Sequence, residues 1–304
     1  MKGGTLLFEE LKTFISVVEY KNFTKAGEHL NLSQPSVSTH IKNLENTLGV
    51  TLINRSIKQK TIFITESGYS LYKRAKEIVN LLDVACMEVK DNSNSIKGHL
   101  KLGASFTIGE YVLPTFLSYF SKKYPDIEVD VFIANTTSIC SQLNELILDV
   151  GLIEGTASHS NFSQEYFLKD KMVLTLPYES DLALNPFSLD KLQNQKWIVR
   201  EEGSGTREFL NMFLCTNEII PKGIMVFGSN YAVKEAVKHN LGITIISDLV
   251  TNPAVKNKEL SVIELDNSYT RHFSYILPKN INISNASDIF LKELKIFSDT
   301  FYSN

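Results

Sequence analysis

The chain has 304 residues, of which 43% are hydrophobic and 21% charged, and its formal net charge is −3. This length allows two or three domains. No apolar run approaches the roughly 20 residues that span a bilayer, and the first residues lack the long apolar region of a secretory signal. The three cysteines, Cys86, Cys140 and Cys215, are far apart in the sequence and odd in number, so neither a disulfide framework nor a zinc site is indicated. We therefore expect a cytoplasmic protein with no membrane partner.

The charge is unevenly distributed along the chain. Residues 1–65 carry eight Lys/Arg and five Asp/Glu, so this part has a balance of +3 and the remainder has −6. A basic end on an acidic body favours contact with nucleic acid through that end alone.

Residues 31–49 are the most informative segment, because they predict a helix suited to a DNA groove. Ser33 is a natural N-cap, and Pro35 fits the first helical turn, where its missing N–H costs nothing. One face carries an apolar stripe at helical spacing: Val37, Ile41, Leu44 and Leu48. The opposite face carries short polar groups and one cation: Pro35, Ser36, Thr39, Lys42 and Asn43, with Gln34 and Ser38 at its edge. Such short side chains allow close approach to base edges and phosphates.

The flanking segments complete a winged helix-turn-helix pattern. A first amphipathic helix is predicted from Phe8, Leu11, Phe14, Ile15 and Val18, and Thr24 can cap a short second helix over 25–30. Residues 50–65 form two β-prone runs around a basic middle, which predicts a wing. The alternative is an ordinary three-helix packing module with a polar surface. The order of cap, proline, stripe, polar face and wing favours binding to double-stranded DNA, with these contacts: Ser33, Gln34, Pro35, Ser36, Ser38, Thr39, Lys42, Arg55 and Lys58.

These residues carry a family resemblance. The matching positions are Ala26, Leu30, 32–38, Ile41, 44–45, 48–49, Leu52, Arg55 and 65–68. They resemble the N-terminus of LysR-type transcriptional regulators, and the length and the α/β pattern extend the resemblance over essentially the whole chain. It implies an all-α winged helix-turn-helix domain and a long linker helix, followed by a two-lobed α/β effector domain like type 2 periplasmic binding proteins. Gly27, where alanine is usual, departs from the pattern and should loosen the second helix by up to about 1 kcal/mol. Ile53-Asn54 departs as well, because an aromatic residue followed by an acidic or polar residue is common at this place before the wing arginine.

Thr65 can cap a further helix whose apolar residues alternate at spacings of three and four to about Lys90. We expect a dimerisation helix over 66–92, because one recognition helix reads only a half-site. The alternative is a single amphipathic helix lying on its own domain. The sequence therefore predicts a homodimer or homotetramer, without choosing between them, and a flexible joint over 91–98.

From residue 99 on, strands and helices alternate, which predicts two βαβ units. The expected strands are 100–104, 127–133, 150–153, 197–200, 224–227 and 243–246, and the expected helices are 109–124, 138–148, 206–215, 231–238 and 288–301. Runs 172–176 and 272–277 would connect two lobes. The expected domains are a DNA-binding domain over 1–65, the linker helix over 66–92, a first lobe over 98–170 with 270–304, and a second lobe over 171–269.

Several turns after these strands carry hydroxyls, amides and glycines. Helix N-termini there present free N–H groups, and ligands of open α/β sheets bind beyond the carboxyl ends of strands. The candidates for binding a small, anionic effector are Ser105, Phe106, Thr107, Asn135, Thr136, Ser204, Gly205, Thr206 and Asn230. The string 200–207 is similar to one in LysR-type regulators of sulfur assimilation and carbon dioxide fixation, which suggests sulfur oxyanions or phosphorylated metabolites as effectors.

Catalytic and cofactor roles find no support in the sequence. No histidine pair has metal-ligand spacing, and none lies in a nucleophile motif. We expect no cofactor, His40 packed against the first helix, and Trp197, Cys140 and Cys215 in cores. The alternatives to an effector-controlled regulator are a small-molecule enzyme fused to a DNA-binding head and an effector-independent DNA-binding repressor or architectural protein. The DNA-binding head and the missing signal argue against a transport receptor.

Overall fold

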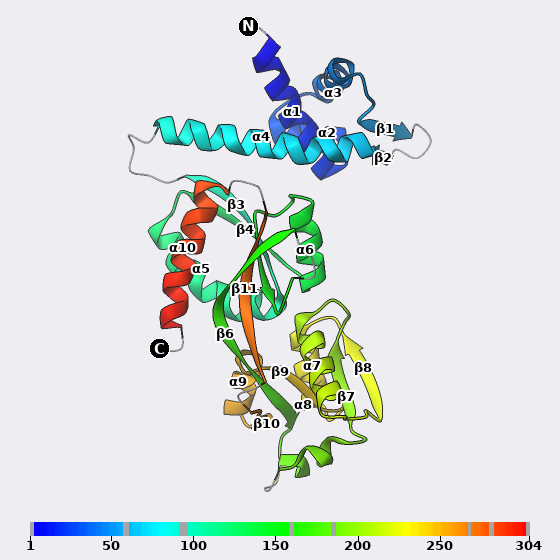
Figure 1. The fold of residues 1–304 in the computed structure, drawn as a ribbon, viewed down its shortest axis with the longest axis vertical. Coiled ribbons are helices and arrows are strands. Elements are labelled where there is room, and N and C mark those ends of the chain that lie inside the picture. Colours follow the sequence, from blue (N-terminus) through cyan, green and yellow to red (C-terminus); the bar gives the residue numbers. More distant parts are fainter. Residues whose placement is uncertain are drawn as a thin grey trace. The chain divides into compact units, whose positions relative to one another are not determined.

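The computed structural model describes residues 3–56, 61–90, 97–157, 161–183, 187–266, 269–279 and 283–301. The chain forms two compact units: a helical unit that holds residues 3–56 and 61–90, and a larger α/β unit that holds most described residues from 97 on (Figure 1).

Three helices form the body of the helical unit: α1 (Gly3–Tyr20), α2 (Phe23–Leu30) and α3 (Gln34–Leu48). They close around one apolar core, which includes Phe14, Val17, Ala26, Val37, Ile41 and Leu44. Ser33 caps α3 as predicted, because its hydroxyl accepts a hydrogen bond from the Ser36 N–H at 3.2 Å. The predicted stripe is buried except at its last residue, Leu48, which is 44% exposed in the final turn before Gly49.

One prediction for α2 is wrong. Its N-cap is Asn22, not Thr24: the Asn22 side chain accepts hydrogen bonds from the N–H groups of Thr24 and Lys25, so the helix begins two residues earlier than predicted. The loosening of α2 by Gly27 stays a prediction, and the structure gives this glycine a steric role as well. A Cβ there would lie 2.6 Å from the Leu32 carbonyl oxygen, so the tight turn between α2 and α3 requires a glycine.

The wing is the antiparallel pair β1 (Ile53–Ser56) and β2 (Thr61–Ile64). Glu45 of α3 fixes its start, because one carboxylate oxygen accepts hydrogen bonds from the N–H groups of Leu52 and Ile53, at 2.8 and 3.1 Å. The long helix α4 (Glu66–Lys90) follows and is capped by Thr65 as predicted, with the Gly68 N–H 3.0 Å from the Thr65 hydroxyl. Tyr72 and Ala75 of α4 pack in the core of the helical unit.

The first lobe of the α/β unit is a sheet with helices on both faces. Its elements are β3 (Gly98–Ala104), a π-helical turn (Ile108–Val112), α5 (Leu113–Lys123), β4 (Ile127–Ile133), α6 (Thr136–Asn144), β5 (Val150–Glu154) and α10 (Asn285–Thr300). Strand β3 pairs in parallel with both β4 and β5, as the βαβ pattern predicts. Helix α10 returns from the end of the chain to α5 (red and teal in Figure 1), where Phe290 meets Phe116 edge to face at 5.2 Å.

The second lobe contains β7 (Lys196–Arg200), α7 (Gly205–Thr216), β8 (Gly223–Phe227), α8 (Asn230–Lys238), β9 (Thr244–Ser247), α9 (Asp248–Lys256) and β10 (Leu260–Glu264). Short 3₁₀ turns lie at Asp181–Ala183 and Leu189–Leu192. Strands β7 and β8 are parallel, as predicted. Neither α9 nor β10 was predicted from the sequence; α9 holds an internal proline, Pro253, which a sequence pattern takes for a break.

Two long strands pass through both lobes. Strand β6 (Phe162–Pro177) pairs with β11 (Thr270–Pro278) through its first part, and with β9 and β10 through its second. Both contain the runs expected to connect the lobes, but β6 begins ten residues before the predicted run. The two strands lie side by side in Figure 1, so the chain crosses between the lobes on an antiparallel ladder.

Candidate DNA interface and effector site

The predicted recognition face of α3 is accessible. Gln34, Pro35, Thr39 and Lys42 are exposed, and Ser36 and Ser38 are half-buried. The short side chains are partly ordered by one another: the Gln34 amide donates to the Ser38 hydroxyl at 3.0 Å. The Thr39 hydroxyl donates to the Pro35 carbonyl oxygen at 3.0 Å, which leaves its methyl group and a lone pair for an outside partner. The face is thus built of small groups held in place before any partner arrives.

The wing residues of the prediction are only partly described. Arg55 belongs to β1, but its side chain lies outside the described part, and Lys58 lies outside the described residues altogether. His40 packs as expected, with Nδ1 2.8 Å from the Thr13 hydroxyl of α1.

The α/β unit brings the predicted effector residues together where strands of the two lobes end. Ser105, Phe106 and Thr107 follow β3, Asn135 and Thr136 follow β4, Ser204, Gly205 and Thr206 start α7, and Asn230 starts α8. Contacts between the lobes confirm that these turns meet. The Asn230 amide donates to the Thr107 hydroxyl at 2.9 Å, and the Thr137 N–H donates to the Gly203 carbonyl oxygen at 3.1 Å.

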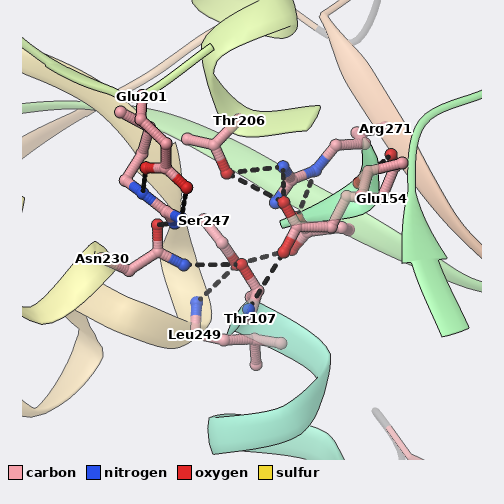
Figure 2. Close-up of polar contacts among 11 residues, drawn as sticks. Thr107, Glu154, Glu201, Thr206, Asn230, Ser247, Leu249 and Arg271 are labelled. Atoms are coloured by element: carbon pink, nitrogen blue, oxygen red, sulfur yellow. Dashed lines mark hydrogen bonds and ion pairs between the residues drawn. The ribbon is translucent and has the colours of Figure 1, made fainter. Parts of the chain in front are cut away.

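Glu154, the last residue of β5, lies at the centre of this meeting point and was not among the predicted site residues. Its carboxylate accepts hydrogen bonds from the Thr107 N–H at 3.0 Å and the Thr206 hydroxyl at 2.9 Å, and pairs with Arg271 at 2.8 Å (Figure 2). Two of the predicted anion donors, the Thr107 N–H and the Thr206 hydroxyl, are therefore engaged by a carboxylate of the protein itself. Helix α7 approaches closely because residue 205 is glycine: a Cβ there would lie 2.5 Å from the Glu154 carbonyl oxygen.

Arg271 connects Glu154 to the strands that cross between the lobes. Its guanidinium also pairs with Asp170, the residue opposite it in the β6–β11 ladder, and Asp170 accepts a hydrogen bond from Ser247 at 2.6 Å. Burial raises the pKa of Glu154, but the charge of Arg271 and the hydrogen bonds from Thr107 and Thr206 outweigh burial and hold this pKa below its usual range. Two buried carboxylates thus share one guanidinium.

A second ion pair lies at the end of β7. Arg200 is buried, and its Nε and Nη2 donate to the two carboxylate oxygens of Glu201, at 2.7 and 2.8 Å. Its Nη1 donates to the Asn230 side-chain oxygen at 2.7 Å, and the guanidinium lies 4.4 Å from the centre of the Phe106 ring. Glu201 also accepts a hydrogen bond from the Asn135 amide of the first lobe, at 3.2 Å.

Ser105 differs from its neighbours. It is 2% exposed, and within the described part of the chain its hydroxyl has no hydrogen-bond partner. A buried hydroxyl without a partner costs about 1–3 kcal/mol, so such groups mark places where a water or ligand is expected. Of the remaining candidates, Thr136 and Ser204 are buried and Asn135 caps α6 through the Ser138 N–H at 3.0 Å.

The residues expected in cores fall into two groups. Trp197 and Cys140 are buried as predicted, whereas Cys215 is exposed, so its placement in a core was wrong. It lies in the last turn of α7 on the exposed face of the helix, whereas Phe213 and Leu214 of the same turn pack in the core. Across the described ranges, no group of His, Cys, Asp and Glu is arranged to hold a metal ion.

Comparison with known proteins decides the family. Residues 8–69 match the bacterial regulatory helix-turn-helix proteins of the lysR family, and residues 93–296 match the LysR substrate binding domain. The chain is a LysR-type transcriptional regulator. The HTH-type transcriptional regulator CysL of Bacillus subtilis is 42% identical to it over 95% of this chain and 97% of that protein. As the family implies, this regulator has a DNA-binding head and an effector-binding domain.

Solved structures support the fold of the regulator. A single-site variant of full-length OxyR from Pseudomonas aeruginosa matches with a TM-score of 0.78 at 17% identity, over 95% of this chain and 94% of that one. The regulatory domain of Synechocystis CcmR, solved in complex with 2-PG, matches with a TM-score of 0.62 at 24% identity, over 66% of this chain and 98% of that domain. No helix among the described residues has the length and apolar content needed to cross a membrane.

Proposed function

We propose that this LysR-type regulator reads duplex DNA through the exposed face of α3. Gln34, Ser36, Ser38, Thr39 and Lys42 would enter the major groove, with Ser33 and Pro35 at the helix start and Arg55 and Lys58 on the flanking backbone. The support is the row of small, preordered polar groups opposite the buried stripe of α3. The chain would act in the cytoplasm as a regulator and not as an enzyme.

The regulator would bind DNA as a homodimer or homotetramer. Its subunits would associate through α4. Ile78, Leu81 and Leu82 are 50%, 54% and 42% exposed on this helix, beyond the part that packs on the DNA-binding core. Exposed apolar side chains along one face of a long helix can be buried against a second copy of the same helix. Leu81→Glu should therefore shift the mass in light scattering from oligomer to monomer, whereas Lys73→Glu on the same helix should leave it unchanged. A monomeric wild-type chain at micromolar concentration would refute this assembly.

A small anionic effector would bind between the two lobes, at the strand ends gathered around Ser105. The observation that carries this proposal is the buried hydroxyl of Ser105, which has no partner in the described part of the chain, while the ring of the next residue, Phe106, stacks on Arg200. The complex of CcmR with 2-PG supports a small ligand in a domain of the same fold. Phe106 would form an apolar wall of this site. The polar groups around the site would come from these residues: Ser105, Thr107, Asn135, Thr136, Ser204, Gly205, Thr206 and Asn230.

Ser105→Ala tests the effector site without disturbing the fold, because among the described residues the hydroxyl has no hydrogen-bond partner that the variant would lose. We expect unfolding at the wild-type temperature or slightly above it, together with at least tenfold weaker binding of whichever anion stabilises the wild type in a thermal-shift panel. The panel contains sulfate, sulfite, thiosulfate, phosphate, sugar phosphates and small carboxylates. Ser118→Ala, on the exposed side of α5, is the control. Unchanged binding by Ser105→Ala would move the site elsewhere, and an empty panel would favour an effector-independent repressor.

A further inference from the structure

The ion pair between Arg200 and Glu201 has the geometry of a ligand complex. Two N–H groups of one guanidinium face two oxygens of one carboxylate, at 2.7 and 2.8 Å. Arginine binds the carboxylate or phosphate group of a ligand with this same fork. In this regulator, a residue of the chain itself occupies the fork.

The two partners of this pair differ in their freedom to leave it. The Arg200 side chain is 1% exposed, so a guanidinium without an anion there would be a buried, uncompensated charge costing several kcal/mol. The Glu201 side chain is 29% exposed and lies in the turn between β7 and α7, so it can rotate into water. Arg200 therefore always needs an anion beside it, but that anion need not be Glu201.

Two other carboxylates near the meeting point of the lobes, Glu154 and Asp170, are fixed. Glu154 is 2% exposed and held by Thr107, Thr206 and Arg271, and the Asp170 side chain is fully buried against Arg271 and Ser247. Removing either from its partners would leave several buried donors unpaired at once. Among these three carboxylates, Glu201 is the one that an incoming anion can replace.

We propose that Glu201 is a resident counter-ion which the effector's acidic group displaces from Arg200. This inference rests on the proposed effector site and specifies its chemistry: the ligand carries an oxyanion with two oxygens in reach of the Arg200 fork, either a carboxylate or a phosphate or sulfur oxyanion. The Phe106 ring stacks on one side of the guanidinium, and the hydroxyl of the preceding residue, Ser105, is free to bond the same ligand. Asn230 stays on Nη1 and holds the guanidinium in its plane.

The exchange also gives the effector a mechanical consequence. Glu201 accepts a hydrogen bond from Asn135, so in the resident state it connects the second lobe to the first. A ligand that takes Arg200 from Glu201 breaks this connection and substitutes its own contacts with Ser105. The arrangement with Glu201 on Arg200 and the arrangement with the effector on Arg200 therefore join the lobes through different groups. The effector binds only the second arrangement, and such a difference in affinity is what allows a ligand to shift a conformational equilibrium.

Glu201→Gln tests the exchange, because it removes the competing charge but keeps the size of the side chain. Glu202→Gln is the matched control: it is the next residue, it loses the same charge, and its side chain is 84% exposed. Isothermal titration of the three full-length proteins would use inorganic phosphate, sulfate and oxalate as separate probes, which distinguishes the phosphate, sulfur and carboxylate classes. We expect Glu201→Gln to bind at least one probe tenfold or more tighter than wild type, and Glu202→Gln to stay within twofold.

Equal or weaker binding by Glu201→Gln would overturn the exchange, since Glu201 would then be a bystander or a ligand-binding group. If Ser105→Ala still weakens the same probe in that case, the proposed effector site stands and only the exchange fails. If no probe binds to wild type or to Glu201→Gln, both the exchange and the anionic effector are overturned.

Discussion

The Thr206 hydroxyl donates a hydrogen bond to Glu154 at 2.9 Å, and this bond joins the first turn of α7 in the second lobe to the end of β5 in the first. Both residues are buried, and Arg271 donates to both. The lobes are thus joined in part by a polar network centred on a carboxylate, and its strength should influence how readily the lobes separate.

Replacing Glu154 by glutamine should destabilise the α/β unit. The amide keeps the shape of the carboxylate but removes the charge that faces Arg271, and its NH₂ group cannot accept the hydrogen bonds that one carboxylate oxygen now accepts. We expect a loss of about 1–3 kcal/mol in the free energy of unfolding, measured by urea denaturation. Glu128→Gln on the exposed face of β4 should change it by less than about 0.5 kcal/mol. A Glu154→Gln variant as stable as this control would show that the network contributes nothing.

Gly205→Ala should separate the lobes by sterics alone. The added Cβ would lie 2.5 Å from the Glu154 carbonyl oxygen, so α7 must shift and the Thr206–Glu154 bond must lengthen. We expect a loss of about 1–3 kcal/mol of stability, typical of an overpacked site, and weaker effector binding. Gly223→Ala is the matched control, because nothing lies within 4 Å of a Cβ there. Equal unfolding midpoints for the two variants would contradict the close approach of α7 to β5.

The packing of α10 on α5 should depend on pH through Glu293. Burial raises the pKa of this carboxyl group, but hydrogen bonds from Lys123, Tyr124 and Tyr119, at 2.8 to 2.9 Å, more than offset burial and lower the pKa. A lowered pKa in the folded state means that the stabilisation is present above the ordinary value of about 4.3 and is lost as the pH falls through the folded value.

Glu293→Gln should therefore be less stable than wild type at pH 7, and the difference should shrink as the pH falls below about 4.3. Urea denaturation at pH 7 and at a series of lower pH values measures this. If the difference in free energy of unfolding between the two proteins stayed constant over this pH range, the three donors would not stabilise the ionised form of Glu293.

Much of this architecture could be predicted from the sequence, since periodicity and capping are local. The apolar stripe of α3, the Ser33 and Thr65 caps and the strands β3, β4 and β5 agree with their predicted positions to within a few residues. The Arg271–Asp170 pair joins residues 101 positions apart, and only the register of β6 against β11 brings them together. Glu154 is the last residue of the apolar strand β5. The polar residues after other strands were predicted as site residues, but Glu154 was not. Its role depends on donors from three distant segments, which no local pattern contains.

Lys42 should contact a phosphate or a base edge, because it is the one cation on the predicted recognition face of α3. Lys42→Ala should weaken binding to duplex DNA and lower the slope of log K against log salt concentration by about 1. Lys122→Ala, an equally exposed lysine on α5, should leave the slope unchanged. Fluorescence anisotropy over a salt series measures both, and identical slopes for the two variants would remove Lys42 from the interface.

The most direct test of the central claim is a comparison of DNA sequence preference between wild type and a Gln34→Ala/Thr39→Ala/Lys42→Ala variant. Fluorescence anisotropy would be measured with a duplex from the chain's own upstream region and with a scrambled duplex of equal length. We predict that wild type prefers its own duplex by about 10³-fold or more and that the variant loses most of this preference while remaining folded and oligomeric. A variant that keeps the wild-type preference would show that the α3 face does not read DNA.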